Sequence, residues 1–387
     1  MCGIFGAVHV RLSEHKAMQC LNQLEHRGPD GFGLWQKDGV TLGHRRLAIL
    51  DLSDNGTQPM SYAEGRYQLV YNGEIYNFLE IRRELLQKGY VFKSETDSEV
   101  ILAAFMEWKE DCQNHFNGMW AFAIWDCQTK RLFLSRDRFG VKPLYYAILP
   151  DGGFTFASEM KSIIPVLPSV EADGQAFALY REKVHYENQD KCIIKNIKRF
   201  PAGCCGWLSE GNVRIKRWWN TLDHLIEVPS DYNEQVEMFR ELFLDSCRIR
   251  MRSDVRIGTA LSGGLDSSAS ICAMAHIAKN GGTGRMSKDW QHAYVACFPG
   301  TFLDESEYAK KVTDFLGIES TFLEVDNTVS QADLYRYIYQ FEELYTNMQI
   351  PMIKIYEQER KYGTLVSIDG HGADELFGGY SFDIVKA

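Results

Sequence analysis

The chain lacks the segments that would carry it into or across a membrane. No run of about 18 apolar residues occurs in its 387 residues, so no transmembrane helix is expected. The N-terminus also lacks a basic stretch followed by an apolar one, which is the layout of a secretory signal peptide. Lys and Arg number 42 against 52 Asp and Glu, and the net charge of −10 argues against a nucleic-acid partner. We therefore expect a cytoplasmic protein with neither membrane nor nucleic acid as a partner.

Two further patterns are missing, one of cysteines and one of glycines. The ten cysteines include no CxxC pair, and without a signal peptide they are expected to be reduced thiols, not disulfides or zinc ligands. Adjacent Cys204 and Cys205 are expected to point to opposite faces of one strand. The Walker pattern GxxxxGK[ST] is absent as well, which excludes a nucleotide site of that type.

The composition is that of an ordinary globular protein, with 45% hydrophobic and 24% charged residues. A length of 387 residues favours two domains. A mixed polar stretch with Pro229 separates them, and we place one domain at residues 2–222 and the other at residues 233–387.

Cys2 directly follows the initiator methionine and could combine two reactive groups. A small second residue generally permits removal of that methionine, which would leave a free α-amine beside the thiol. The ordinary pKa values of these groups, about 7.7–8.0 and about 8.5, lie near neutral pH, so Cys2 could hold a nucleophile and its general base together. A buried cysteine at the start of an edge strand is the alternative that Cys2 alone leaves open.

The first domain shows strands and hairpins around a few helices. A strand is predicted at residues 2–10, a helix at 12–24, a strand at 40–50, a strand at 69–71 that ends in a turn at Asn72-Gly73-Glu74, and helices at 77–88 and from Thr96 onward. Two hairpins follow, at 119–125 with 131–135 and at 145–148 with 154–157. This order favours an α+β sandwich over a parallel sheet.

The second domain alternates strands and helices. After a hairpin-like stretch at 200–219 and a helix at 233–251, strands are predicted at 255–261, 293–298, 320–325 and 365–368, with helices at 269–279, 306–316 and 331–343. This alternation predicts a doubly wound parallel sheet, an α/β architecture.

A glycine-rich segment, Ser262-Gly263-Gly264-Leu265-Asp266-Ser267-Ser268, joins the first of these strands to its helix. Backbone N–H groups and the helix dipole would point at one place there, and the glycines let a phosphate approach closely. A Ser/Gly turn that merely caps the helix is the structural alternative.

Several motifs in order resemble the glutaminase domain of class II glutamine amidotransferases, in the asparagine synthetase branch. They are Cys2-Gly3-Ile4, His26-Arg27-Gly28-Pro29-Asp30, His44-Arg45-Arg46-Leu47, Asn72-Gly73-Glu74-Ile75-Tyr76-Asn77, Thr96-Asp97-Ser98-Glu99, Arg136-Asp137-Arg138-Phe139-Gly140, Pro143-Leu144-Tyr145-Tyr146 and Ala157-Ser158-Glu159.

The resemblance implies an N-terminal-nucleophile αββα sandwich that hydrolyses glutamine to glutamate and ammonia. Cys2 would attack the side-chain amide, and Asn72 with the Gly73 N–H would form the oxyanion hole. Arg46 would bind the glutamine α-carboxylate, while Asp97 would bind the α-ammonium group with support from Glu74.

The second half resembles the ATP pyrophosphatases, which activate a carboxylate with ATP and release pyrophosphate. ATP would bind at Leu261, Ser262, Gly263, Gly264, Leu265, Asp266 and Ser267, with magnesium held through ATP. The acceptor and pyrophosphate side would include Asp369, Gly370, His371, Asp374 and Glu375. Glutamine, ATP and a carboxylate acceptor are thus the implied partners, and a homodimer is a further expectation by analogy.

Two departures from the family pattern leave the acceptor and the activity of the second half open. Asparagine synthetases typically carry Ser-Gly-Glu-Gly where this chain has Asp369-Gly370-His371-Gly372, which puts aspartate in doubt and admits a sugar uronic acid. The chain stops seven residues after Tyr380, without the later family segments, so we expect a C-terminally truncated form that could act only as a glutaminase. Besides an amidotransferase and a protein that is only a glutaminase, a third hypothesis is a relative without catalytic activity that binds a partner.

Overall fold

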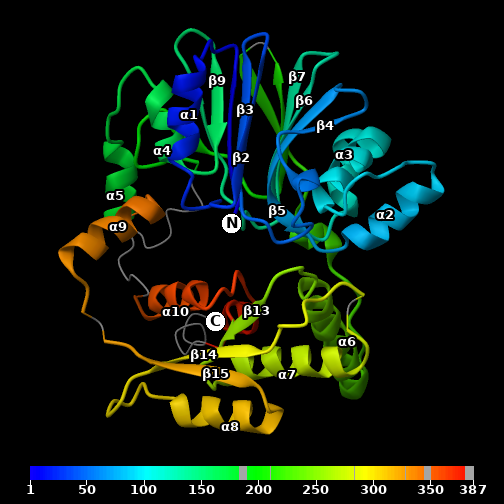
Figure 1. Ribbon diagram of the computed structural model, residues 1–387, viewed down its shortest axis with the longest axis vertical. Coiled ribbons are helices and arrows are strands. Elements are labelled where there is room, and N and C mark those ends of the chain that lie inside the picture. The colour runs from blue at the N-terminus through cyan, green and yellow to red at the C-terminus, as the bar shows by residue number, and fades with distance from the viewer. Residues whose placement is uncertain (183–189, 210, 283, 327, 344–349, 380–387) are drawn as a thin grey trace. The chain divides into compact units, whose positions relative to one another are not determined.

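The computed structural model describes residues 1–182, 190–209, 211–282, 284–326, 328–343 and 350–379. The chain divides into two units, one of Met1–Ile226 with Arg336–Thr346 and one of Glu227–Tyr335 with Asn347–Ala387 (Figure 1). Local sequence patterns do not reveal that Arg336–Thr346 packs with the first unit. None of the described helices is both long and apolar enough to span a bilayer.

Two six-stranded antiparallel sheets form the centre of the first unit. The first has the order β10 (Ile197–Arg199), β8 (Tyr145–Ile148), β9 (Phe154–Ala157), β1 (Gly3–Val8), β3 (Val40–Arg46) and β2 (Gly31–Lys37). The second has the order β12 (Asn212–Arg217), β11 (Cys204–Ser209), β7 (Arg131–Arg136), β6 (Gly118–Asp126), β5 (Tyr67–Ile75) and β4 (Met60–Tyr62).

Helices cover the outer faces of both sheets (Figure 1). Beside the first sheet lie α1 (Glu14–Asn22), α4 (Met160–Ile163) and α5 (Gly174–Glu182), and beside the second lie α2 (Phe78–Gln87) and α3 (Asp97–Trp108). The arrangement is the predicted αββα sandwich. It has three hydrophobic layers because each sheet is buried on both faces.

Alternating side chains of single strands show this double burial. Ile4 packs between the sheets while its neighbour Phe5 packs against α1 and α4. Cys204 likewise packs between the sheets while Cys205 faces α3, as predicted. A central strand must therefore be free of charged residues on both faces, which explains the fully buried run Gly3–Val8.

The turn predicted at Asn72-Gly73-Glu74 is wrong. These residues lie inside β5, where Asn72 pairs with Ala121 and Gly73 with Trp120 of β6. A Cβ on Gly73 would come within 2.3 Å of the Met119 carbonyl oxygen, so glycine is needed here for close strand approach, not for a turn.

Two neighbouring glutamates attach the segment Arg336–Thr346 to the first unit. The Glu342 carboxylate accepts hydrogen bonds from the backbone N–H groups of Met160 and Lys161, each at 2.6 Å. Glu343 forms an ion pair with Arg199. These buried contacts are made by residues more than 140 positions apart in the sequence.

The second unit contains the predicted parallel sheet, in the order β15 (Glu319–Glu324), β14 (His292–Cys297), β13 (Ile257–Ala260) and β16 (Val366–Ser367). The helices are α6 (Tyr232–Arg250), α7 (Leu265–Lys279), α8 (Ser306–Leu316), α10 (Ile350–Lys361) and α11 (Ala373–Phe377), with α9 (Gln331–Phe341) crossing the division between the units. The chain runs outward from β13 to β15 and returns to the other side of β13 with β16. The strand order thus reverses between β13 and β16, which is where ligands bind in such sheets.

Two predictions in this unit need correction. Helix α7 begins at Leu265, not at Ala269, so half of the glycine-rich segment forms the first helical turn. Helix α10 was not predicted.

Candidate active site

A cavity in the first unit brings together five of the six residues predicted for glutamine hydrolysis. Cys2, Arg46, Gly73, Glu74 and Asp97 line it. They come from the residue before β1, the end of β3, the strand β5 and the first residue of α3. The two sheets of the sandwich bring these elements together, since β1 and β3 belong to one sheet and β5 to the other.

The Cys2 thiol is held by one residue of the chain after β3. Its Sγ accepts a hydrogen bond from the Leu47 N–H at 3.4 Å and lies 3.6 Å from the Leu47 carbonyl oxygen. The Arg27 Nε donates to the Cys2 carbonyl at 2.9 Å, which fixes the backbone. Burial raises the pKa of the Cys2 thiol, and the Leu47 N–H opposes that rise because it stabilises a thiolate.

Asn72, the sixth predicted residue, is not among the lining residues, and it lies in β5 between Tyr71 and Gly73, which do line the cavity. Its side chain is 1% exposed, and its Nδ2 has no hydrogen-bond partner among the residues that the structure describes. A buried amide N–H without an acceptor is costly, so a donor left in this state is suited to a ligand oxygen. This feature fits the predicted oxyanion hole.

Arg46 is oriented by backbone carbonyl groups of the segment that follows β3. Its Nη1 donates to the Ser53 carbonyl at 2.7 Å, and its Nη2 donates to the Asp51 carbonyl. A Cβ on Gly56 would come within 2.2 Å of Nη2, so glycine leaves the space that the guanidinium fills.

Asp97 lies at the N-terminus of α3, where Thr96 is the N-cap and accepts a hydrogen bond from the Glu99 N–H. The Asp97 Oδ2 accepts hydrogen bonds from the Tyr71 hydroxyl at 2.7 Å and the Ile75 N–H at 2.9 Å. Burial raises the pKa of Asp97. A cationic ligand group would offset that cost, in agreement with the predicted ammonium-binding role.

Two residues of the cavity were missed in the sequence. Tyr71 orients Asp97, and His44 donates from Nε2 to the Tyr71 carbonyl at 3.2 Å. Burial lowers the pKa of His44 to about 3, so its imidazole is neutral at physiological pH. His44 belongs to a motif that carried the resemblance, whereas no local signal distinguishes Tyr71 from an ordinary core tyrosine.

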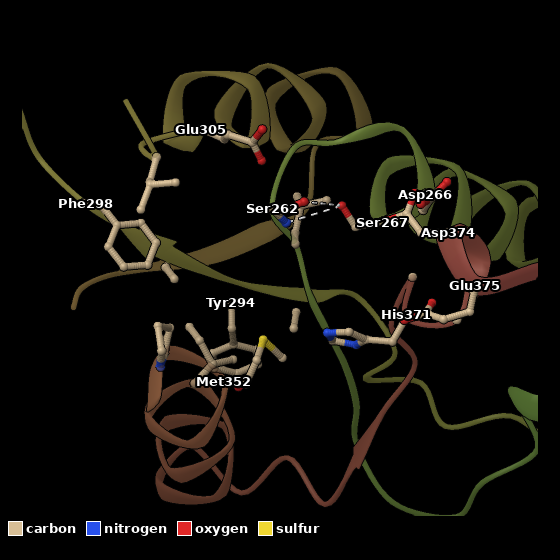
Figure 2. Close-up of a pocket in the computed structure, with 18 residues that line it drawn as sticks. Ser262, Asp266, Ser267, Tyr294, Phe298, Glu305, Met352, His371, Asp374 and Glu375 are labelled. Atoms are coloured by element: carbon tan, nitrogen blue, oxygen red, sulfur yellow. Dashed lines mark hydrogen bonds between the residues drawn. The ribbon is translucent and has the colours of Figure 1, made fainter. Parts of the chain in front are cut away.

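A second cavity, of about 440 Å³, lies at the carboxyl ends of β13 and β16 in the other unit (Figure 2). Of the predicted ATP and acceptor residues, Leu261, Ser262, Asp266, Ser267, Gly370, His371, Asp374 and Glu375 line it. Gly263, Gly264 and Leu265 are not among the lining residues, and neither is Asp369.

The glycine-rich segment forms an anion-binding turn. The N-cap of α7 is Gly264, whose position has no side-chain cap, so N–H groups of the first turn remain available to a ligand. The Ser262 hydroxyl lies 3.1 Å from that of Ser267 (Figure 2). The same hydroxyl accepts a hydrogen bond from the Gly264 N–H at 3.1 Å. These contacts fold the turn around the helix N-terminus.

Gly370 brings the second predicted segment against this turn. A Cβ at this position would come within 2.5 Å of the Ser267 nitrogen. Asp369 holds the same junction, because its carboxylate accepts hydrogen bonds from the Ala260 N–H at 2.7 Å and the Tyr356 hydroxyl at 2.8 Å. Asp369 therefore ties β16 to β13 instead of lining the cavity.

The acidic residues of this cavity do not form a preassembled metal site. No cluster of three or more His, Cys, Asp or Glu side chains able to hold a metal ion occurs in the described part of the chain. Figure 2 shows His371 and Glu375 beside the turn, with Phe298 on the opposite wall. The side chain of His371 is 62% exposed, and its Nδ1 lies 3.9 Å from Asp369 Oδ2.

Comparisons with known proteins agree with both sites. Residues 1–219 match the glutamine amidotransferase domain family, and residues 238–384 match the asparagine synthase family. Asparagine synthetase [glutamine-hydrolyzing] 1 of Bacillus subtilis is 32% identical over 98% of this chain and 59% of its own length. The putative asparagine synthetase [glutamine-hydrolyzing] 2 of Methanocaldococcus jannaschii is 34% identical over 98% of this chain and 76% of its own length.

Among solved structures, glutamine phosphoribosylpyrophosphate amidotransferase from B. subtilis matches with a TM-score of 0.45 and 14% identity, over 87% of this chain and 70% of that one. The chain spans about three fifths of the B. subtilis synthetase. Since both family models match in order and the relatives align with nearly the whole chain, it belongs to the asparagine synthetase family of glutamine amidotransferases.

Proposed function

We propose that the protein is a glutamine-dependent amidotransferase that releases ammonia at Cys2 and transfers it to a carboxylate activated by ATP. The observation that carries this proposal is the cavity in the first unit. A thiol, an arginine and a carboxylate line it, and the adjoining strand β5 supplies the buried amide donor of Asn72, which has no partner among the described residues. These are the four chemical groups that glutamine hydrolysis needs.

The geometry supports a thioester route. After removal of Met1, the Cys2 amine takes the thiol proton and Sγ attacks the side-chain carbonyl carbon of glutamine. Asn72 Nδ2 and the Gly73 N–H stabilise the oxyanion, and collapse of the tetrahedral intermediate expels ammonia as it receives the proton. Water then hydrolyses the thioester to glutamate. Arg46 and Asp97 bind the α-carboxylate and the α-ammonium group, and Glu74 assists at the ammonium end.

The second cavity suits ATP. Bound there with magnesium, ATP would activate the acceptor carboxylate by adenylation and release pyrophosphate. The uncapped N-terminus of α7 would bind phosphate oxygens, and Gly263 and Gly264 would let them approach the backbone. Asp374 and Glu375 lie at the same cavity, where they would hold magnesium together with the phosphates.

Aspartate is the acceptor proposed by family default, and a sugar uronic acid is the second candidate. The observation that favours the second is His371, which lines the cavity with an exposed imidazole. An imidazole can donate and accept hydrogen bonds, so it offers an acceptor different contacts from those of a glutamate carboxylate.

Trapping at Cys2 tests the glutaminase step. The protein is incubated with a diazoketone analogue of glutamine, and intact and peptide masses are measured. We expect one adduct on an N-terminal Cys2 and loss of glutamate formation in Cys2→Ala. Cys127→Ala removes another partly exposed thiol and should leave both unchanged. An N-terminal peptide that retains Met1 and takes up no analogue would contradict the proposal and revive a binding role.

Pyrophosphate release tests the acceptor. It is measured with ATP, magnesium, glutamine and either aspartate or a uronic acid. Release with aspartate supports the family default, and release with the uronic acid alone excludes it. Glutamate formation without pyrophosphate release under either condition would show a protein that acts only as a glutaminase.

A further inference from the structure

The Arg136-Asp137-Arg138-Phe139-Gly140 motif folds the loop after β7 and determines the position of Lys142. The Asp137 carboxylate accepts hydrogen bonds from four backbone N–H groups, those of Trp120, Phe139, Val141 and Lys142, at 2.9–3.1 Å. Arg136 donates to the carbonyl groups of Lys142 and Gly140 at 2.8 and 2.7 Å. Because the Lys142 N–H donates to Asp137 and the Lys142 carbonyl accepts from Arg136, the backbone of Lys142 has little freedom.

This loop places the Lys142 ammonium beside the side chain of Met1, the residue that precedes Cys2. Lys142 is 5% exposed, and its Nζ lies 3.1 Å from the Met1 Sδ. The Arg27 Nη2 lies 4.0 Å from the same sulfur. A thioether is a weak acceptor, and it is the acceptor that the described residues supply to this buried ammonium. The group that neighbours Lys142 therefore changes when Met1 is removed.

We propose that Lys142 is a positioning residue of the glutamine site, whose buried ammonium keeps the α-amine of mature Cys2 neutral and able to accept the thiol proton. The inference rests on the proposed glutaminase chemistry. An α-amine can act as a base only without its proton, and a nearby cation disfavours a second positive charge. The same cation favours a thiolate over a thiol, so it assists both halves of the reaction.

The charged groups around Lys142 come from four parts of the first unit. Arg27, after α1, is a second cation, whereas Glu74 in β5, Cys2 before β1 and Asp137 after β7 are acidic. Burial, followed by Arg27, lowers the pKa of Lys142 to about 8, so Lys142 remains mostly charged at pH 7. Burial raises the pKa of Cys2, and Lys142 is among the groups that lower it.

Labelling of the N-terminal peptide at a series of pH values tests the proposal. Iodoacetamide reports the Cys2 thiol and reductive methylation reports the α-amine, both followed by peptide mass spectrometry on protein whose Met1 has been removed. In the wild type we expect the midpoint for the amine below the ordinary value of about 7.7–8.0. Lys142→Met should raise the midpoints of both groups by about one pH unit, and Lys142→Arg should restore them.

Two controls separate this role from a structural one. Lys198→Met removes an exposed lysine of the same unit and should leave the midpoints unchanged. Thermal unfolding shows whether the Lys142 variants remain folded. A folded Lys142→Met protein with unshifted midpoints would overturn the proposal, and so would a wild-type amine that titrates at or above its ordinary pKa.

The labelling is independent of glutamine turnover, so this inference and the proposed function can fail separately. A protein that hydrolyses no glutamine but shows the midpoint shifts would retain the role of Lys142 and lose the glutaminase proposal. Glutamine hydrolysis with unshifted midpoints would do the reverse.

Discussion

At the scale of single residues, the proposed glutamine site includes a group whose hydrogen bonds are incomplete without a ligand. Asn72 is the clearest case, because its amide is buried and its Nδ2 has no partner among the described residues. A folded protein keeps such a donor at a cost of about 1–3 kcal/mol. That cost makes Asn72 a better indicator of a binding site than exposed polar residues are.

Replacement of Asn72 tests this reading. Asn72→Ala should lower kcat for glutamine hydrolysis by about 100- to 1000-fold, since one oxyanion donor is lost. KM should change little, because the proposed contacts of Arg46 and Asp97 with the substrate remain. Steady-state glutamate formation measures both constants. Asn212→Ala, an exposed change on β12, is the control. An equal loss in both variants, or a loss confined to KM, would contradict the assignment.

His44 makes stability depend on pH. Its pKa falls from an ordinary 6.5 to about 3 on folding because of burial, so between these values the unfolded state binds more protons. Stability from this group is therefore complete above about pH 6.5 and is lost as pH falls, by about 1.4 kcal/mol per pH unit.

Urea unfolding from pH 7 to pH 4 measures this dependence. His44→Gln keeps an N–H donor for the Tyr71 carbonyl but does not titrate, so its stability should fall less steeply with acid than that of the wild type. Parallel curves for the two proteins would show that His44 does not contribute.

At the scale of elements, the loop after β7 is held in place by hydrogen bonds, as the strands around it are. Phe139 and Val141, the apolar residues of the loop after β7, are exposed, and the Asp137 carboxylate holds the loop by four backbone hydrogen bonds. Asparagine at this position would turn an amide group toward donors. The sequence motif predicts a loop at this place, but it does not show that the Asp137 carboxylate accepts the backbone hydrogen bonds that hold the loop.

Asp137→Asn should therefore lower the free energy of unfolding by about 2 kcal/mol or more, because buried N–H groups lose their acceptor. Chemical denaturation measures the change. Asp151→Asn makes the same substitution in the exposed turn between β8 and β9, where Asp151 accepts from Gly153, and should cost much less. Equal losses of unfolding free energy in the two variants would show that the four hydrogen bonds to Asp137 do not stabilise the protein more than the single one to Asp151.

At the scale of the whole molecule, the two chemical sites lie in different units. The cavity with Cys2 belongs to the first unit and the cavity with Ser262 to the second. Damage to one unit should therefore leave the chemistry of the other unit in place.

Gly263→Ala tests this independence. Gly263 has φ of 91°, and a Cβ would come within 2.5 Å of the Ala309 nitrogen, so the turn before α7 must shift. We expect ATP affinity, measured by calorimetry, to fall at least about tenfold, because the shifted turn would no longer fit the phosphates. Glutamate formation at Cys2 should persist.

Gly363→Ala is the matched control, because Gly363 also has positive φ, at 76°, but a Cβ added there would meet no described atom within 4 Å. It separates backbone strain from the clash at Ala309. Loss of glutamine hydrolysis in Gly263→Ala alone would show that the two units are coupled.

The sequence alone determined the fold class of each half, and it predicts a nucleophile at Cys2. Hydrophobic periodicity predicts most of the strands and helices because it records which faces are buried. Motifs such as Ser262–Ser268 indicate a ligand because glycines and a helix N-terminus present backbone N–H groups to an anion, whatever the rest of the fold.

Only the tertiary structure decided which residues share a site. Gly73 is a turn signal by local preference, but the neighbouring strand β6 overrides that preference and places it in β5. Asp369 is predicted from the sequence to be a ligand-binding acid, but its hydrogen bonds to Ala260 and Tyr356 connect the end of β16 to β13 and to α10. Lys142 has no local signal at all, because the effect on Cys2 that we propose for it depends on burial and on a contact between residues 141 positions apart in the chain. Burial and long-range contacts set charge states, and neither is encoded in a local pattern of residues.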